Sequence, residues 1–193
     1  MKRKIYLDFD RTLFDTDAFI KDMNKVLEKD IDLLLFEEYK RRDEKKGFNP
    51  YRIIKMMNID NKDEIYQNLD NLMNNVSKYL YPDTIPFLEK MQKEYDLYIF
   101  TYGDKDFQKR KVINTHIDKY INSFIDILDK KSNSLEINYQ ESIFIDDNPF
   151  VIDDILLKKP YMAIRMRRNK AKYSLINMKN KVMEVKSFEE INI

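Results

Sequence analysis

The chain has 193 residues, of which 43% are hydrophobic and 36% charged, a composition typical of a globular protein. Its formal net charge of +1 provides no bulk electrostatic attraction to nucleic acid or to an anionic membrane. The absence of cysteine excludes disulfides, thiolate metal sites and a cysteine nucleophile, and the single histidine excludes a histidine-rich metal site.

The sequence also argues against a membrane location. No apolar run approaches the roughly 18 residues of a membrane span. Residues 1–4 resemble the basic start of a signal peptide, but Asp8 and Asp10 interrupt the apolar segment that follows too early for one. We therefore expect a cytoplasmic protein with no membrane partner, and we expect a monomer.

The first predicted element is a buried strand that ends in two carboxylates. Ile5, Tyr6 and Leu7 form an apolar run without polar alternation, and Asp8 and Asp10 follow it. Residues two apart on a strand share a face, so both carboxylates can reach one point beyond the strand end. A divalent metal such as Mg²⁺ would balance their repulsion. The alternative is a strand that ends in solvated acids.

Residues 15–80 are predicted to form a small all-helical unit between two strands. Asp15, Thr16 or Asp17 can cap a first helix, and Gly47 is a natural stop after the second. The predicted helices cover residues 18–27, 31–46 and 50–57. A fourth helix is predicted to begin at Asn61 or Asp63, and its single apolar stripe extends to Leu80.

The rest of the chain alternates between strands and helices. The predicted strands cover residues 97–101, 124–128, 142–145 and 161–166, and the helices between them cover 84–91, 104–112 (with a basic outer face) and 149–157. A short strand and a helical turn are expected within 182–191. This alternation predicts an α/β protein with a doubly wound parallel sheet, built from residues 1–14 and 81–193.

Two more predicted strands end in polar residues. Thr101-Tyr102-Gly103-Asp104 follows one, and Asp146-Asp147-Asn148-Pro149 follows the other. The carboxyl ends of parallel strands meet at one edge of a sheet, where α/β proteins bind their ligands. Gly103 is one of only two glycines, which indicates a constrained loop or a close approach to a ligand, although an ordinary turn is the alternative.

In this order, DFDRTLF, FTYGD, a lysine near Lys131 and IFIDDNP resemble the motifs of the haloacid dehalogenase (HAD) superfamily, whose commonest members are Mg²⁺-dependent phosphohydrolases. The resemblance covers the predicted core. The segment between the first two motifs matches only in being helical, like the cap of many relatives. The resemblance implies a Rossmann-like, HAD-like fold with a helical cap.

The resemblance also implies a role for each motif residue. Asp8 would be the nucleophile that forms an aspartyl-phosphate, and Asp10 the general acid and base. Thr101 would bind the phosphoryl group, helped by the backbone N–H of Tyr102. A lysine would neutralise the phosphate. We choose Lys131, because Leu135 fits the helical phase that follows this lysine in the family, but Lys130 remains open.

The resemblance implies a Mg²⁺ site that uses the carboxylate of Asp8, the backbone carbonyl of Asp10, and the acidic pair Asp146 and Asp147. We favour Asp147 as the direct ligand and Asp146 as a water-mediated one. A solvated turn is the alternative for this pair, but two adjacent buried acids are costly without a cation.

Further residues are candidates for substrate binding. Besides Thr101, Tyr102 and Gly103, these are Arg11, which occupies a position that is often glycine in the family, and Arg52 near the Gly47 turn. For each arginine the alternative is a solvated side chain. A basic cluster follows the last core strand and favours either an anionic substrate or a solvent-exposed edge: Arg165, Arg167, Arg168, Lys170 and Lys172.

The sequence therefore predicts a Mg²⁺-dependent phosphatase that hydrolyses a small phosphorylated metabolite through a phospho-Asp8 intermediate. A phosphomutase would use the same residues and protect the intermediate from water. A non-catalytic phosphate-binding protein is the alternative outside enzymes, although none of the expected catalytic residues is missing. An enzyme acting on nucleic-acid ends would favour a basic groove, which the net charge does not indicate.

Overall fold

The computed structural model describes residues 2–29, 31–134 and 137–193. Leu135, which favoured Lys131 over Lys130 in the sequence, lies outside these ranges. Across the described residues, no helix combines the length and the apolar character needed to cross a membrane.

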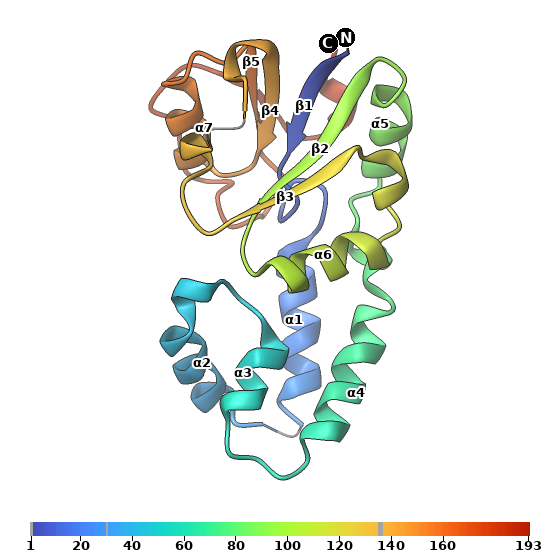
Figure 1. Cartoon of the computed structure of the whole chain (residues 1–193), viewed down its shortest axis with the longest axis vertical. Coiled ribbons are helices and arrows are strands. Elements are labelled where there is room, and N and C mark those ends of the chain that lie inside the picture. The colour runs from blue at the N-terminus through green and yellow to red at the C-terminus, as the bar shows by residue number, and fades with distance from the viewer. Residues whose placement is uncertain (1, 30, 135–136) are drawn as a thin grey trace.

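A parallel sheet forms the centre of the fold, as predicted (Figure 1). Its order is β3-β2-β1-β4-β5-β6, and every neighbouring pair is parallel. The strands span Arg3–Leu7 (β1), Tyr95–Tyr102 (β2), Ser123–Ile127 (β3), Ser142–Asp146 (β4), Met162–Met166 (β5) and Met183–Val185 (β6). Leu7 pairs with Ile99 on β2 and with Ile145 on β4. This register places Asp8 beside the carboxyl ends of β2 and β4.

Helices cover both faces of the sheet. These are α5 (Thr84–Met91), α6 (Lys105–Asn114) and α7 (Pro149–Leu156), with α7 on the opposite side from α5 and α6 (Figure 1). Alternating strand residues serve the two faces: Tyr6, Phe100 and Phe144 pack with Ile155 of α7, whereas their neighbours join the larger cluster on the other face. The burial of all of β4, and of Ile5, Tyr6 and Leu7 in β1, follows from this two-sided covering.

The segment between β1 and β2 is helical, and its helices lie beyond the carboxyl ends of the strands, away from both termini (Figure 1). They are α1 (Thr16–Leu27), α2 (Leu33–Arg42), α3 (Pro50–Met56) and α4 (Lys62–Met73). The expected helix up to Leu80 is too long: α4 ends at Met73, and a 3₁₀ turn covers Val76–Tyr79. Asn74 and Asn75, both poor helix formers, separate the two.

Two helices that follow strand ends, α1 and α6, each begin at an aspartate whose side chain caps the helix. Asp15 accepts a hydrogen bond from the Ala18 amide, and Asp104 accepts one from the Phe107 amide. Such caps satisfy amides that have no partner within the helix. The caps of α1 and α6 therefore define where the chain leaves the first two strand ends.

The helical segment and the sheet share one hydrophobic core. Phe14, next to the first acidic motif, packs its ring against Phe19 of α1 and against Tyr79. Phe107 of α6 contacts both Phe19 and Phe48, which lies between α2 and α3. These aromatic contacts hold the helical segment over the carboxyl edge of the sheet.

Candidate active site

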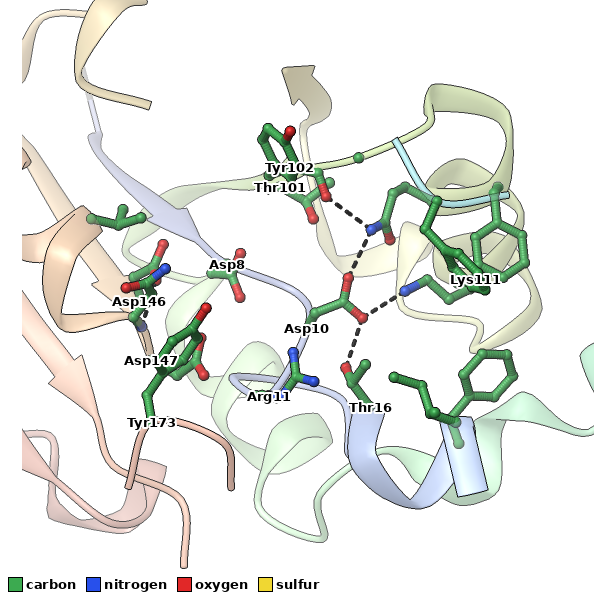
Figure 2. Close-up of a pocket in the computed structure, with 18 of the residues that line it drawn as sticks. Asp8, Asp10, Arg11, Thr16, Thr101, Tyr102, Lys111, Asp146, Asp147 and Tyr173 are labelled. Carbon is green, nitrogen blue, oxygen red and sulfur yellow. Dashed lines mark hydrogen bonds and ion pairs between the residues drawn. The ribbon is translucent and has the colours of Figure 1, made fainter. Parts of the chain in front are cut away.

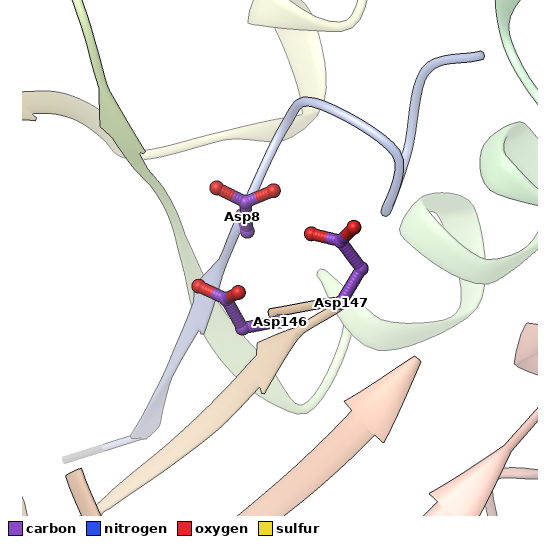
Figure 3. Close-up of side chains that lie close together, drawn as sticks. All are labelled: Asp8, Asp146 and Asp147. Carbon is purple, nitrogen blue, oxygen red and sulfur yellow. The ribbon is translucent and has the colours of Figure 1, made fainter. Parts of the chain in front are cut away.

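Three carboxylates meet at the carboxyl edge of the sheet (Figure 3). Asp8 follows β1, Asp146 is the last residue of β4, and Asp147 is the next residue along the chain. All three are buried, and one carboxylate oxygen from each lies within 4.8 Å of the others. Asp146 Oδ1 also accepts a hydrogen bond from the Asn148 amide, which fixes its orientation.

A buried lysine joins two of these carboxylates. Lys131 Nζ lies 2.6 Å from Asp8 Oδ1 and 2.7 Å from Asp146 Oδ2. Burial alone would lower the pKa of Lys131, but Asp146 and Asp8 raise it above its ordinary value. Lys130 is exposed and pairs with Asp154 at 3.3 Å. Of the two lysines left open by the sequence, the structure brings Lys131 to the carboxylates.

The three carboxylates carry more negative charge than Lys131 can balance. Burial raises the pKa of Asp8 to about 7, against the effect of Lys131 and helped by the charge of Asp146. Burial and then the charges of Asp8 and Asp146 raise the pKa of Asp147 to about 9. Asp147 Oδ2 is buried without a hydrogen-bond partner among the described residues. A buried set of carboxylate oxygens with an unpartnered member fits a hard divalent cation such as Mg²⁺.

The end of β2 supplies a hydroxyl to the same site. Thr101 is buried, and its Oγ1 has no hydrogen-bond partner among the described residues. Tyr102 is 52% exposed and lines the same cavity. The Gly103 amide donates to the carbonyl of Ile127 at 3.1 Å, so it is used within the fold. The three residues predicted here therefore differ: Thr101 has a free hydroxyl, Tyr102 borders the opening, and Gly103 shapes the loop.

Asp10 lies on the other side of Asp8 from Asp146 and Asp147 (Figure 2). Its carboxylate does not belong to the three-carboxylate group but accepts hydrogen bonds from Thr16, Gln108 and Lys111 at 2.6–2.7 Å. Burial would raise the pKa of Asp10, but Lys111 and these hydrogen bonds lower it below its ordinary value.

Lys111 is a site residue that the sequence analysis missed. We expected a basic outer face on this helix, and Lys105 and Lys109 are exposed, but Lys111 is buried. The available signal was its spacing from Phe107, since residues four apart share a helix face. Its partner, Asp10, lies 101 residues away in the sequence, so no local pattern indicated the pair.

The two arginines proposed for substrate binding are both paired within the protein. Arg11 has a φ of 65°, the backbone region that favours glycine, in agreement with the glycine common there in the family. Its guanidinium pairs with Asp17 at 2.7 Å and lines the cavity. Arg52 pairs with Asp43 and Asp104 and does not line it. Arg52 thus connects α3 to the loop after β2.

The sequence left two interpretations open for the basic cluster after β5, and one of them, a solvent-exposed edge, is wrong for two of its members. Arg165 is fully buried and donates to the carbonyl of Tyr173 at 2.7 Å. Arg168 is also buried and pairs with Asp83 at 2.7 Å. Asp83 lies 85 residues from Arg168. Tyr173 lies only 8 residues from Arg165, but it accepts through its backbone carbonyl, which no side-chain pattern indicates. Composition alone therefore suggested solvent exposure for both arginines. The segment that these arginines hold brings Tyr173 to the cavity wall (Figure 2).

The three carboxylates, Lys131, Thr101, Asp10 and Lys111 border one cavity of about 700 Å³ between the strand ends and the helices α1 and α2. The size is that of pockets for small ligands. Its floor contains Asp8, Thr101 and Lys131, and its helical side includes Ile20 and Lys40. The cavity therefore combines a charged end at the sheet with a more apolar region near the helices.

Several solved structures share the fold of this chain. A haloacid dehalogenase-like hydrolase from Burkholderia xenovorans matches with a TM-score of 0.72 and 14% sequence identity, over 97% of this chain and 94% of that one. YfnB from Bacillus subtilis, a HAD-hydrolase bound to magnesium, matches with a TM-score of 0.65 and 13% identity, over 98% and 96% of the two chains. The chain has the HAD fold.

A third solved structure with this fold is that of a dehalogenase. L-2-haloacid dehalogenase from Xanthobacter autotrophicus, with chloropropionic acid covalently bound, matches with a TM-score of 0.62 and 12% identity, over 97% of this chain and 96% of that one. No protein-family model and no curated protein sequence matches the chain. The resemblance predicted from the motifs is thus confirmed at the level of the fold, while the reaction has to be argued from the site.

Proposed function

We propose that the protein is a Mg²⁺-dependent phosphatase that hydrolyses a small phosphomonoester through a phospho-Asp8 intermediate. The observation that carries this proposal is that Asp8 shares a buried group with Asp146, Asp147 and Lys131. The Thr101 hydroxyl, which has no hydrogen-bond partner among the described residues, borders the same cavity. Phosphoryl transfer needs a nucleophile, positive charge around the phosphoryl oxygens and hydrogen-bond donors. This corner of the cavity supplies each of these.

In the first step, an oxygen of Asp8 attacks phosphorus, and the bond from phosphorus to the leaving oxygen breaks. Asp10, which takes up a proton when the negatively charged phosphate of the substrate lies beside it, gives that proton to the leaving oxygen. An alcohol departs, and Asp8 is left as an acyl phosphate. Lys131 and the Thr101 hydroxyl bind the phosphoryl oxygens. A bound Mg²⁺, held by Asp8, Asp146 and Asp147, would neutralise negative charge on the transferred group.

In the second step, water attacks the phosphorus of phospho-Asp8. Asp10, now ionised, accepts a proton from this water, and the bond between phosphorus and the Asp8 oxygen breaks. Inorganic phosphate leaves, and both carboxyl groups return to their starting state. The same pair of residues thus serves both steps, which requires that Asp10 lies close enough to serve the leaving oxygen and then the water.

The acidic pair favours phosphoryl transfer over dehalogenation. Displacing a halide by a carboxylate requires neither a proton donor nor a divalent cation, because the halide departs as an anion. Here Asp146 and Asp147 add two buried carboxylates to the nucleophile, and Asp10 provides a proton donor. Burying these acids is costly unless they take part in binding a cation.

The test is phosphate release from a panel of phosphomonoesters, with Mg²⁺ and with chelator, for the wild type and for Asp8→Asn. Asp106→Asn, which changes an exposed aspartate on α6, is the matched control. We expect metal-dependent release by the wild type and the control, and none by Asp8→Asn. Halide release from 2-chloropropionate without phosphate release would overturn the proposal. A stable phospho-Asp8 that passes its phosphoryl group to a second sugar or alcohol would indicate the mutase alternative.

A further inference from the structure

The ammonium of Lys111 is enclosed by aromatic rings. Its Nζ lies 5.1 Å from the ring centroid of Phe9, 5.4 Å from that of Phe14 and 5.5 Å from that of Phe107. The residue is 3% exposed, and its charged partner among the described residues is Asp10, at 2.6 Å. A buried ammonium is costly without a carboxylate beside it. Lys111 therefore cannot turn away from Asp10 without losing this compensation.

The two carboxylate oxygens of Asp10 accept hydrogen bonds from different donors (Figure 2). Oδ1 accepts hydrogen bonds from Lys111 and from Thr16 at 2.6 and 2.7 Å. Oδ2 accepts one from Gln108 at 2.7 Å. Because a carboxylate oxygen has two lone pairs, Oδ1 is fully used and Oδ2 keeps one lone pair free. A proton added to Asp10 is therefore best accommodated on Oδ2.

We propose that Lys111 is a positioning residue that acts through Asp10: it holds Oδ1, so that Oδ2 is the atom that passes the proton to the leaving oxygen. This inference rests on the proposed phosphatase function. In the step it describes, the bond from phosphorus to the leaving oxygen breaks, and the proton moves from Oδ2 to that oxygen. Asp10 is left as a carboxylate paired with the Lys111 ammonium, and no other reactant is needed.

The two residues that work with Lys111 come from different parts of the fold. Gln108 lies one helical turn before Lys111 on α6, and Thr16 is the first residue of α1. Gln108 also donates to the carbonyl of Tyr102 at 3.0 Å, which connects Asp10 to the end of β2. Asp10 is thus held between the sheet edge and the start of the helical segment, and within the described part of the chain its charged contact is Lys111.

A role in leaving-group protonation predicts a dependence on the leaving group that a structural role does not. We would compare 2-phenylethyl phosphate, whose alkoxide leaves only with a proton, with 4-nitrophenyl phosphate, whose phenolate leaves without one. The variants are Lys111→Met, which keeps most of the length of the side chain but removes its charge, and Lys111→Arg, which restores a cation. Lys109→Met is the matched control, since Lys109 is exposed on the same helix.

In Lys111→Met we expect kcat for the phenylethyl ester to fall about 10- to 100-fold, part of the usual contribution of a general acid, while kcat for the nitrophenyl ester falls less than about threefold. Lys111→Arg should recover most of the loss, and Lys109→Met should change neither rate. Adding Lys111→Met to Asp10→Asn should cause no further leaving-group effect, because both act through one proton.

Equal losses for both esters, or a rise in KM for both without a change in kcat, would overturn the inference in favour of a structural or phosphate-binding Lys111. If circular dichroism shows that Lys111→Met is unfolded, Gln108→Met takes its place. We then expect a smaller fall in kcat for the phenylethyl ester. Equal losses of kcat for both esters would again overturn the inference. Absence of turnover of both esters by the wild type would instead overturn the proposed function, and this inference with it.

Discussion

Gly47 sits where the helical segment touches the loop after β2, and replacing it with alanine tests that contact. Gly47 has a φ of 76°, a conformation that side chains with a Cβ disfavour. A Cβ at this position would lie 2.6 Å from the carbonyl carbon of Gly103 and closer still to the amide nitrogen of Asp104. Both obstacles are backbone atoms, so no side-chain rotation can relieve the overlap.

The destabilisation expected for Gly47→Ala follows from three terms. The left-handed backbone costs a residue with a Cβ about 1–2 kcal/mol. Overpacking against fixed neighbours typically costs about 1–3 kcal/mol. Alanine restricts the unfolded chain and returns about 0.4–1 kcal/mol. The net loss is then about 1–5 kcal/mol, a large share of the roughly 5–15 kcal/mol that stabilises a typical protein.

Urea denaturation measures this loss directly. With a slope of about 2 kcal/mol per molar urea, the midpoint of Gly47→Ala should fall by about 0.5–2.5 M. Gly47→Asn is the informative companion, because asparagine tolerates the left-handed backbone but has the same Cβ. If the overlap dominates, both variants lose similar stability. A midpoint within about 0.2 M of the wild type for Gly47→Ala would refute the reasoning, since it would show neither backbone strain nor overpacking at this position.

Arg168→Met removes the cation from the carboxylate of Asp83, whose side chain is 9% exposed. We therefore expect a loss of about 3–5 kcal/mol in the free energy of unfolding, measured with urea, and a loss below about 1 kcal/mol would contradict this. The pKa of Asp104 is lowered by hydrogen bonds from the backbone and from Arg52, although burial acts in the opposite direction. The stability that ionised Asp104 provides is therefore present above its unfolded pKa and lost as pH falls below about 4. Asp104→Asn should lose less stability than the wild type between pH 5 and 2.5, and equal losses would count against the interaction. Mg²⁺ should raise the melting temperature of the wild type but not of Asp147→Asn, and an equal rise in both would remove Asp147 from the metal site.

Local sequence patterns predicted the parts of the site that follow directly from strand ends. Asp8 and the pair Asp146-Asp147 each come straight after an apolar run, and parallel strands bring such ends to one edge. The pattern could not distinguish Lys130 from Lys131, because both lie in a loop where the backbone alone decides which side chain turns inward. In the structure, Lys131 turns inward and its Nζ contacts the carboxylates of Asp8 and Asp146.

What the sequence could not predict are charged residues whose partners lie far along the chain. Lys111 and Arg168 belong to stretches rich in basic residues, and a solvated side chain is the usual interpretation of any one lysine or arginine there. Their burial depends on Asp10 and Asp83, which are 101 and 85 residues away. Tertiary packing decides such pairs. For the same reason Arg52, interpreted as a substrate contact from its place near a turn, is paired within the fold.

The central claim is that Asp8 receives the phosphoryl group, and rapid quenching of the wild type with a ³²P-labelled phosphomonoester in the presence of Mg²⁺ tests it most directly. Peptide mapping of the acid-quenched protein should place the label on Asp8, and hydroxylamine should release it, as it does from an acyl phosphate. Asp8→Asn, mixed in the same way, should carry no label. Label on another residue, or turnover of the ester by Asp8→Asn at the rate of the wild type, would contradict the account.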